Sequence, residues 1–338
     1  ADVVEENSSA STMFQLLEEP LGTRAVGMGG AGSATAGTGF SHYNPAMPFF
    51  GGKPRLSVDY GQQSHADFGR SMLEGIWVGK TWFAGIDFTN FTIDDILMAD
   101  ERGTGSAFNW QESFLSATAG FIRTRFAGGV MLHGMQARAG TQTAYGLSLS
   151  AGIGYRLLDD KLSLGLAAFH LGQTTPMVDS LQKLGKGSDL PMSGRLGGAW
   201  RDTLGSLPYE IAADVVYRYE DDKIMLPVGI EIVPLRFLAL RAGKRIGHDT
   251  ELLSFGFGLR TGALSADASF VVPRYVSDSE LKWVVGLSYT LQPPTTRKPK
   301  PPTLSTPSVA EEVITPAPRD TVSVQEVVPD TLSPNPSS

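Results

Sequence analysis

Two glycine-containing stretches resemble nucleotide-binding motifs. Gly27, Gly29 and Gly32 have the G-x-G-x-x-G spacing of a dinucleotide-binding turn. That turn needs a strand before it, a helix after it and an acidic residue about twenty positions later. The first acidic residue after these glycines is Asp59, and prolines interrupt the stretch between. The Gly-Lys-Thr tripeptide at 79–81 lacks the earlier glycine of a phosphate-binding loop. We therefore expect no nucleotide cofactor.

Histidine and acidic side chains are the remaining candidates for catalysis or metal binding. His170 is the strongest, because it continues the apolar phase of a predicted strand, but no nucleophile motif lies near it. A lone histidine near a strand end is typical of a membrane-interface residue. The acidic residues Asp94, Asp95, Asp100 and Glu101 do not have the spacing of an EF-hand calcium loop. We expect no enzymatic activity, no cofactor and no bound metal.

The composition limits the class of protein. The 338 residues include 39 glycines and no cysteine, 19% of them are charged, and the net charge is −7. Without cysteine, the chain has no disulfide and no thiolate metal site. The acidic balance and the lack of a basic stripe argue against nucleic acid as a partner.

The glycine-rich stretch from Ala25 to Gly52 is uncharged, and its length suggests a membrane span. However, its 8 glycines and the prolines Pro45 and Pro48 would weaken any helix across it. The composition better fits a compact, irregular plug of small residues, packed inside a larger structure that satisfies its backbone amides.

From Lys53 onward the hydrophobic pattern has a period of two, which is typical of strands with one apolar and one polar face. For example, Leu147, Leu149 and Ile153 alternate with serine and glycine. About fourteen strands fit before residue 292, an even number suited to a transmembrane antiparallel β-barrel. The predicted ranges are 54–60, 68–79, 81–91, 106–121, 124–136, 144–156, 161–173, 191–201, 207–219, 223–232, 235–245, 251–260, 264–273 and 281–291.

The predicted connections favour a membrane barrel over a soluble β-sandwich or propeller. If the first strand runs outward, the inner connections are tight, apart from a somewhat longer one at Arg201–Leu207. The outer connections are mostly longer and more polar, above all Thr92–Gly105 and Thr174–Leu190. Such a difference between the two rims is typical of outer-membrane barrels, whereas a soluble β protein has no need of it.

The C-terminal stretch has a different composition from the rest. Residues 293–338 hold 11 of the 21 prolines and no glycine or aromatic residue. This composition cannot form a core and predicts an extended, disordered tail. Such a tail is either a tether to the cell wall or a partner, or a solvated spacer.

The N-terminal stretch carries a pattern made of Leu16, Leu17, Pro20, Arg24, Gly27, Met28, Gly29, Gly30, Ala34, Asn44, Pro45 and Ala46. This pattern resembles the N-terminal signature of the PorV/PorQ family, outer-membrane proteins of the FadL-like barrel group. The chain departs from the family at Thr23, before the arginine. It departs again at 37–39, where glycine and threonine replace the acidic residues common in the family.

The resemblance implies a fourteen-stranded barrel with the N-terminal segment folded into the lumen as a hatch. Arg24 would then pair with a lumen carboxylate, since an unpaired buried guanidinium costs several kcal/mol. Glu210 and Asp214 are the alternative partners. The Asn-Pro-Ala tripeptide would turn the hatch into the first strand. The implied domains are an N-terminal segment and hatch (1–52), the outer-membrane barrel (53–292) and a periplasmic tail (293–338).

The resemblance also implies a location and two hypotheses for function. The location is the outer membrane of a Gram-negative-type bacterium, with the signal peptide removed. The first hypothesis is a docking or scaffold role in type IX protein secretion or surface attachment. Its partners would be outer-membrane lipid and other secretion-machinery proteins, bound through the two longest outer loops. The alternative is a FadL-like channel for passive uptake of long-chain fatty acids or other hydrophobic compounds, with a hydrophobic ligand in the lumen. A continuous apolar lumen would favour the channel, and a plugged lumen the docking role.

Overall fold

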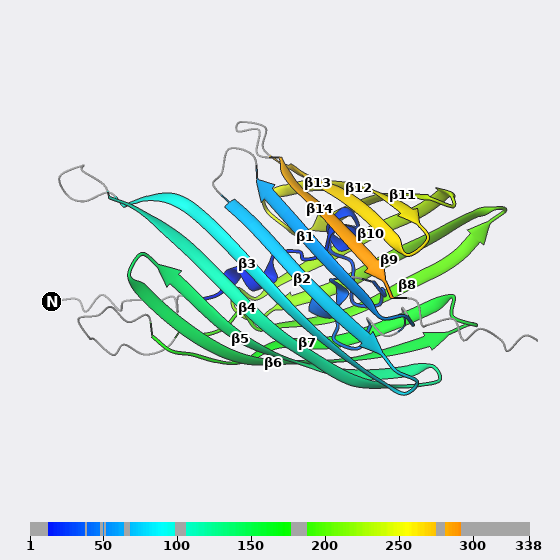
Figure 1. Ribbon diagram of the computed structural model, residues 1–338, viewed down its shortest axis with the longest axis horizontal. Helices are drawn as coiled ribbons and strands as arrows, with labels where there is room; N and C mark the ends of the chain where they lie inside the picture. Colours follow the sequence, from blue (N-terminus) through cyan, green and yellow to red (C-terminus); the bar gives the residue numbers. More distant parts are fainter. Residues whose placement is uncertain are drawn as a thin grey trace, which may run out of the picture. The chain divides into compact units, whose positions relative to one another are not determined.

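In the computed structural model, fourteen antiparallel strands form a closed barrel (Figure 1). Each strand pairs with its neighbours in sequence, and the first pairs with the last. The structure describes residues 13–37, 39–47, 50, 52–63, 68–98, 106–176, 188–274 and 281–291. The predicted tail and parts of the two longest outer loops lie outside these residues.

The observed strands follow the predicted ranges, with differences mostly at their ends. For example, β3 ends at Met98 rather than at residue 91. The strands are β1 (Arg55–Gln63), β2 (Phe68–Val78), β3 (Trp82–Met98), β4 (Ser106–Arg123), β5 (Phe126–Ala139), β6 (Gln142–Leu157), β7 (Leu162–Thr174), β8 (Ser193–Leu204), β9 (Leu207–Arg218), β10 (Lys223–Leu235), β11 (Leu238–Ile246), β12 (Glu251–Thr261), β13 (Leu264–Pro273) and β14 (Lys282–Thr290).

The side chains that point outward from the strands are mostly large, apolar and exposed. In β6, exposed Leu147, Leu149 and Ile153 alternate with buried Ser148 and Ser150. A soluble sheet would cover such a row with a second layer, whereas lipid covers it in a transmembrane barrel. The prediction of a membrane-type barrel rather than a sandwich is therefore confirmed. Among the described helices, none has the length and apolar character to cross a membrane.

The two rims of the barrel differ less than predicted. We call the rim that joins β2 to β3 the inner rim and the opposite one the outer rim. The inner-rim connection from β8 to β9, predicted to be longer, is a two-residue turn because Leu204 pairs with Leu207. On the outer rim, Ala139 pairs with Gln142, so β5 and β6 also meet in a tight turn. Strand pairing thus continues through polar residues that the sequence assigned to loops.

The N-terminal segment lies inside the barrel, where its regular elements are short (Figure 1, dark blue). They are the 3-10 helices η1 (Gln15–Glu18) and η2 (Phe40–His42) and the single-turn α1 (Thr23–Gly27). α1 packs against β11 to β14. Ala25 and Met28 have no exposed surface. We use the name hatch for residues 13–52; the predicted division between residues 52 and 53 stays a prediction.

Candidate functional site

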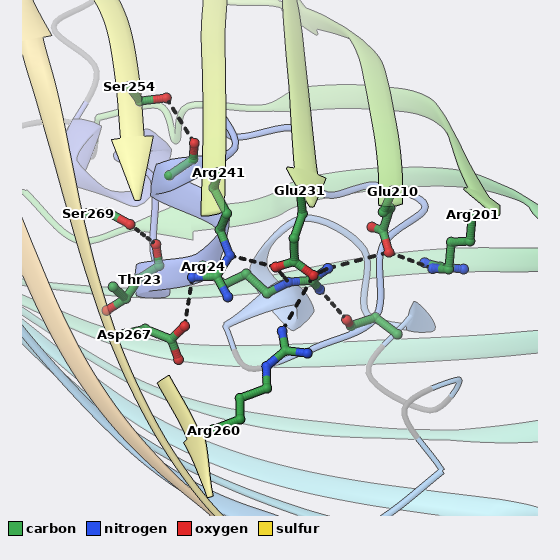
Figure 2. A network of polar contacts seen from close by, with 12 residues as sticks. Thr23, Arg24, Arg201, Glu210, Glu231, Arg241, Ser254, Arg260, Asp267 and Ser269 are labelled. Atoms are coloured by element: carbon green, nitrogen blue, oxygen red, sulfur yellow. Dashed lines mark hydrogen bonds and ion pairs between the residues drawn. The ribbon is translucent and has the colours of Figure 1, made fainter. Parts of the chain in front are cut away.

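α1 carries Arg24 into a charged network on the inner wall of the barrel (Figure 2). The Nε and Nη2 atoms of Arg24 donate to the two carboxylate oxygens of Glu231 at 2.8 and 3.0 Å. Nη2 also lies 3.4 Å from Oε2 of Glu210, one of the two predicted partners. Nη1 donates to the carbonyl oxygen of Ala36 at 2.8 Å. Arg24 therefore joins α1 both to the wall and to a later part of the hatch.

The network extends along the wall beyond Arg24. Its members are Arg24, Arg201, Arg241, Arg260, Glu210, Glu231 and Asp267. Arg241 bridges two acids, with Nε 2.6 Å from Glu231 and Nη1 2.6 Å from Asp267. Burial alone would lower the pKa of Arg24, but Glu231 and Glu210 raise it above its ordinary value. Because opposite charges surround it, Arg24 stays ionised in an interior that would otherwise disfavour charge.

Sequence reasoning missed Glu231, which makes the closest contact with Arg24. Glu231 is 5% exposed and lies in β10 between Ile230 and Ile232. The sequence did offer one signal: Glu231 is a single carboxylate among the inward-pointing residues of an otherwise apolar strand. Nothing in the spacing indicated which strand would face α1, because that depends on how the hatch is folded within the lumen.

Asp214, the other predicted partner of Arg24, holds a different part of the hatch. One oxygen of its carboxylate accepts hydrogen bonds from the backbone amides of Gly32 and Ser33, both at 2.9 Å. The same oxygen accepts a third from the Ser33 hydroxyl at 2.7 Å. Asp214 is 2% exposed, so this carboxylate satisfies hatch amides that no water could reach.

Carboxylates on the opposite side of the barrel bind the hatch in the same manner. Glu74 of β2 accepts a hydrogen bond from the backbone amide of Gly39 at 2.9 Å. Asp87 of β3 lies 3.0 Å from Nε2 of His42. Burial lowers the pKa of His42, but Asp87 outweighs this and raises it above its ordinary value. The hatch is thus anchored to both sides of the wall by groups that the wall supplies.

The glycines of the predicted signature lie where hatch backbone meets wall backbone. Gly29 has a φ of +65°, and a Cβ there would lie 2.5 Å from the amide nitrogen of Lys244. Gly243 faces it from β11, and a Cβ at that position would lie 2.2 Å from the nitrogen of Gly29. A side chain at either position would clash with backbone. Gly27 also meets the wall, with a would-be Cβ 2.7 Å from Oγ of Ser269, whereas Gly30 has a φ of +77° and more space.

The Asn-Pro-Ala tripeptide forms a buried turn. Nδ2 of Asn44 donates to the carbonyl oxygens of Ser33 and Ile153 at 2.8 and 2.9 Å. Its Oδ1 accepts from the amide of Ala46 at 3.0 Å. Asn44 therefore ties two parts of the hatch to β6. The turn does not lead directly into β1, which begins at Arg55.

His170 lies inside the barrel, so the prediction of a membrane-interface histidine was wrong. Leu149 pairs with Leu171 and Ala151 with Ala168, which leaves two residues of β7 opposite one of β6. This β-bulge reverses the alternation of β7 and gives His170 a φ of +61°. Its ring lies 5.4 Å from the ring of His133.

No metal site is evident in the described part of the chain. Among these residues no group of three or more His, Cys, Asp or Glu could hold a metal ion. Of the acidic run considered for calcium, Asp100 and Glu101 lie outside the described residues.

An apolar cluster occupies the outer half of the lumen. Phe14 packs edge-on against Phe114, with 6.1 Å between ring centroids, and Phe114 packs against Phe91 at 5.8 Å. The cluster comprises Phe14, Leu17, Leu21, Met72, Phe91, Phe114, Met135, Ala137 and Leu190. Hatch and wall contribute jointly to this surface.

A charged cavity of about 440 Å³ lies on the inner side of the network. It is lined by Arg201, Glu210 and Glu231 of the network. Residues of two inner-rim turns, including Asp159 and Lys161, line the rest. The outer half of the lumen therefore contains this apolar cluster, whereas charged side chains line the cavity at the inner half.

Comparison with family models and with curated protein sequences finds no match. Solved structures are similar in fold. One is the CymD monoaromatic hydrocarbon channel, at a TM-score of 0.58 and 14% identity, over 80% of this chain and 97% of that one. The Pseudomonas putida toluene transporter TodX gives 0.56 and 14%, over 81% and 99%. A Pseudomonas aeruginosa FadL homologue gives 0.53 and 12%, over 79% and 97%. At these identities the likeness shows the fold alone: the chain has the closed fourteen-stranded barrel of the FadL-like group, and the PorV/PorQ part of the resemblance stays a prediction.

Proposed function

We propose that this protein is an outer-membrane channel for hydrophobic compounds, closed by its hatch. The observation that carries the proposal is the apolar cluster in the outer half of a FadL-like lumen. Three barrels of similar fold are a monoaromatic hydrocarbon channel, a toluene transporter and a FadL homologue. A cluster of phenylalanine and methionine side chains offers such solutes, once they displace the hatch side chains packed there, the apolar surface that water does not.

The cluster also gives a way to couple binding to opening. Phe14, Leu17 and Leu21 belong to the hatch, so a solute that enters among the wall phenylalanines competes with them for the same surface. Leu21 lies three positions before Arg24 in the chain. Displacement of Leu21 would therefore pull on the ion pairs with Glu231 and Glu210, which hold α1 against the wall.

The charged inner half of the lumen sets a limit on this mechanism. A hydrocarbon cannot replace either partner of the buried Arg24–Glu231 pair, because it carries no charge and makes no hydrogen bond. A hydrocarbon that separated the two side chains would leave both charges uncompensated. Passage along the axis therefore requires α1 to move away from the wall first. The hatch is the barrier, and its movement is the step that controls uptake.

Uptake by reconstituted protein tests the proposal. Liposomes that contain the full chain should accumulate radiolabelled toluene or a medium-chain fatty acid faster than empty liposomes. Phe114→Asp should lower that rate about tenfold or more, because a carboxylate within the cluster costs several kcal/mol. Gln111→Asp, on an exposed position of the same strand, is the matched control. Equal rates for Phe114→Asp and the control would refute the channel.

The second candidate is the docking role in type IX secretion, which the N-terminal signature favours. The close fit of hatch and wall backbones at Gly29 and Gly243 also suits a barrel that stays plugged. Crosslinking in the native membrane followed by purification would test this candidate. Recovery of secretion-machinery proteins, together with normal uptake of hydrophobic compounds after deletion of the gene, would favour docking over transport.

A further inference from the structure

A small cavity lies between the hatch and the wall in the outer half of the lumen. Its volume is about 30 Å³, which is room for one or two water-sized particles. The polar residues that line it include Glu18, Glu19, His42, Tyr43, His170, Arg195 and Arg245. The cavity is too small for a chain-shaped solute and is separate from the Arg24 network.

Arg195 of β8 brings a positive charge to this cavity, and although Glu18 lines the same cavity, the two form no ion pair. Its guanidinium lies over the ring of Tyr43, 4.8 Å from the centroid. Its Nη1 atom is buried and donates no hydrogen bond. No ion pair joins Arg195 to any carboxylate in the part of the chain that the structure describes. Arg195 as a whole is half-buried, but buried donor atoms are usually paired, so its Nη1 atom lacks an expected acceptor.

The carboxylates that line the cavity are already engaged with other cations. Glu18 lies 2.7 Å from Nε of Arg218, and Glu19 lies 3.5 Å from Nζ of Lys282. The other lining guanidinium also has its own acid, because Arg245 pairs with Glu251 at 2.5 Å. Of the two arginines that line the cavity, Arg195 is thus the one without an ion pair in the described part of the chain.

His170 supplies a second buried polar atom to the same cavity. Its side chain lines the cavity, the residue is 5% exposed, and its Nδ1 has no hydrogen-bond partner. The bulge in β7 is what turns this ring inward. In the tautomer that carries its proton on Nδ1, this atom is a donor without an acceptor. It and Nη1 of Arg195 then belong to two residues that line one cavity, where an acceptor is missing for each.

We propose that this cavity binds a small inorganic monoanion of halide size, held by Arg195 and His170 against the hatch. The volume excludes larger anions, and the nearby carboxylates Glu18 and Glu19 disfavour a second negative charge. The anion would link the β7–β8 wall to the hatch residues that share the cavity, and so stabilise the closed state. The proposal does not depend on what the channel transports.

Thermal unfolding of the purified full-length protein tests the site. Chloride or bromide, compared with gluconate at equal ionic strength, should raise the midpoint saturably, by about 2–4 °C at tenfold the dissociation constant. Arg195→Gln should abolish the shift, whereas Arg236→Gln, an exposed arginine in an inner-rim turn, should keep it. If Arg195→Gln does not fold, His170→Ala replaces it and should at least halve the shift.

Diffraction from crystals grown in bromide gives an independent measure. The proposal expects an anomalous peak within hydrogen-bond reach of Arg195 Nη1 and His170 Nδ1. Ordered water alone in the cavity, no halide dependence of the midpoint, or a shift that persists in Arg195→Gln would each overturn it.

Discussion

Gly165→Ala should open the barrel while leaving its wall intact. Gly165 lies in β7, and a Cβ there would come 1.7 Å from the carbonyl oxygen of Ser33 in the hatch. Ordinary contacts of a Cβ begin at 3.4 Å. Either the hatch or the strand must therefore shift by 1.7 Å to restore an ordinary contact. The strand is held by ladders to β6 and β8, so the hatch is the part that moves.

The size of the effect follows from overpacking. Extra methyl groups in a well-packed interior cost about 1–3 kcal/mol. If that cost falls on the closed state alone, the fraction of open barrels rises by about 5- to 150-fold, since 1.4 kcal/mol corresponds to a factor of ten. The shift would also disturb the three hydrogen bonds of Ser33 and Gly32 with Asp214, which adds to the same effect.

Ion conductance across planar lipid bilayers measures the open fraction directly. Gly165→Ala should raise the time-averaged conductance and make the hatch more sensitive to proteolysis. Gly134→Ala is the matched control, because a Cβ there points outward and meets only the Leu115 carbonyl, at 3.8 Å. If the two variants conduct alike and unfold at the same temperature, the hatch and the wall are not in close contact at Gly165.

Three further predictions concern the anchors of the hatch. Glu231→Gln should destabilise the folded protein by about 3–5 kcal/mol, measured by thermal unfolding in detergent, because three arginines lose their shared acid; an unchanged midpoint would contradict the network. Asn44→Ala should lower the free energy of unfolding by about 1–3 kcal/mol, and with it the midpoint, since it leaves the Ser33 and Ile153 carbonyls without their donor. Burial would raise the pKa of Glu19, but Lys282, Arg245 and Arg70 outweigh it and hold the pKa at about 2. This pKa lies below the ordinary glutamate value of 4.5, so the ionised Glu19 carboxylate stabilises the folded protein. That stabilisation is complete above pH 4.5 and is lost as the pH falls toward 2. In Glu19→Gln the thermal midpoint should therefore fall less steeply below pH 4.5 than in the unmodified protein. The same fall in both proteins would rule out a stabilising role for the Glu19 carboxylate.

The barrel could be predicted because its pattern is local. A strand that faces lipid on one side repeats every two residues, so Leu147, Leu149 and Ile153 reveal their common face without knowledge of the partner strands. Antiparallel neighbours joined by short turns then leave little freedom in the order of strands. The β7 bulge escaped prediction because one extra residue reverses the alternation, and neither Phe169 nor His170 carries a signal for it in the sequence.

The contacts of the hatch could not be predicted in the same way. The hatch has almost no regular structure, so no period relates its residues to those of the wall. Arg24 was expected to find a carboxylate, but Glu231 is 207 positions away, and several inward acids satisfied the same criterion. The sequence shows that the buried charge of Arg24 needs a carboxylate partner. Which carboxylate it meets depends on how the hatch folds within the lumen.

Charge is distributed unevenly between the hatch and the wall. Gly39, which lies before the Asn-Pro-Ala tripeptide, donates its amide to the carboxylate of Glu74 on the wall. Between residues 25 and 52 the hatch has no charge except that of His42 when protonated. In this part of the hatch the acids thus lie on the wall, and residues 25–52 present amides and hydroxyls to them. The ionic anchors precede it: Glu18 and Glu19 pair with one wall cation each, whereas Arg24 pairs with two wall carboxylates, Glu231 and Glu210. Uptake should therefore respond more strongly to changes at Arg24 than at any other residue of the hatch.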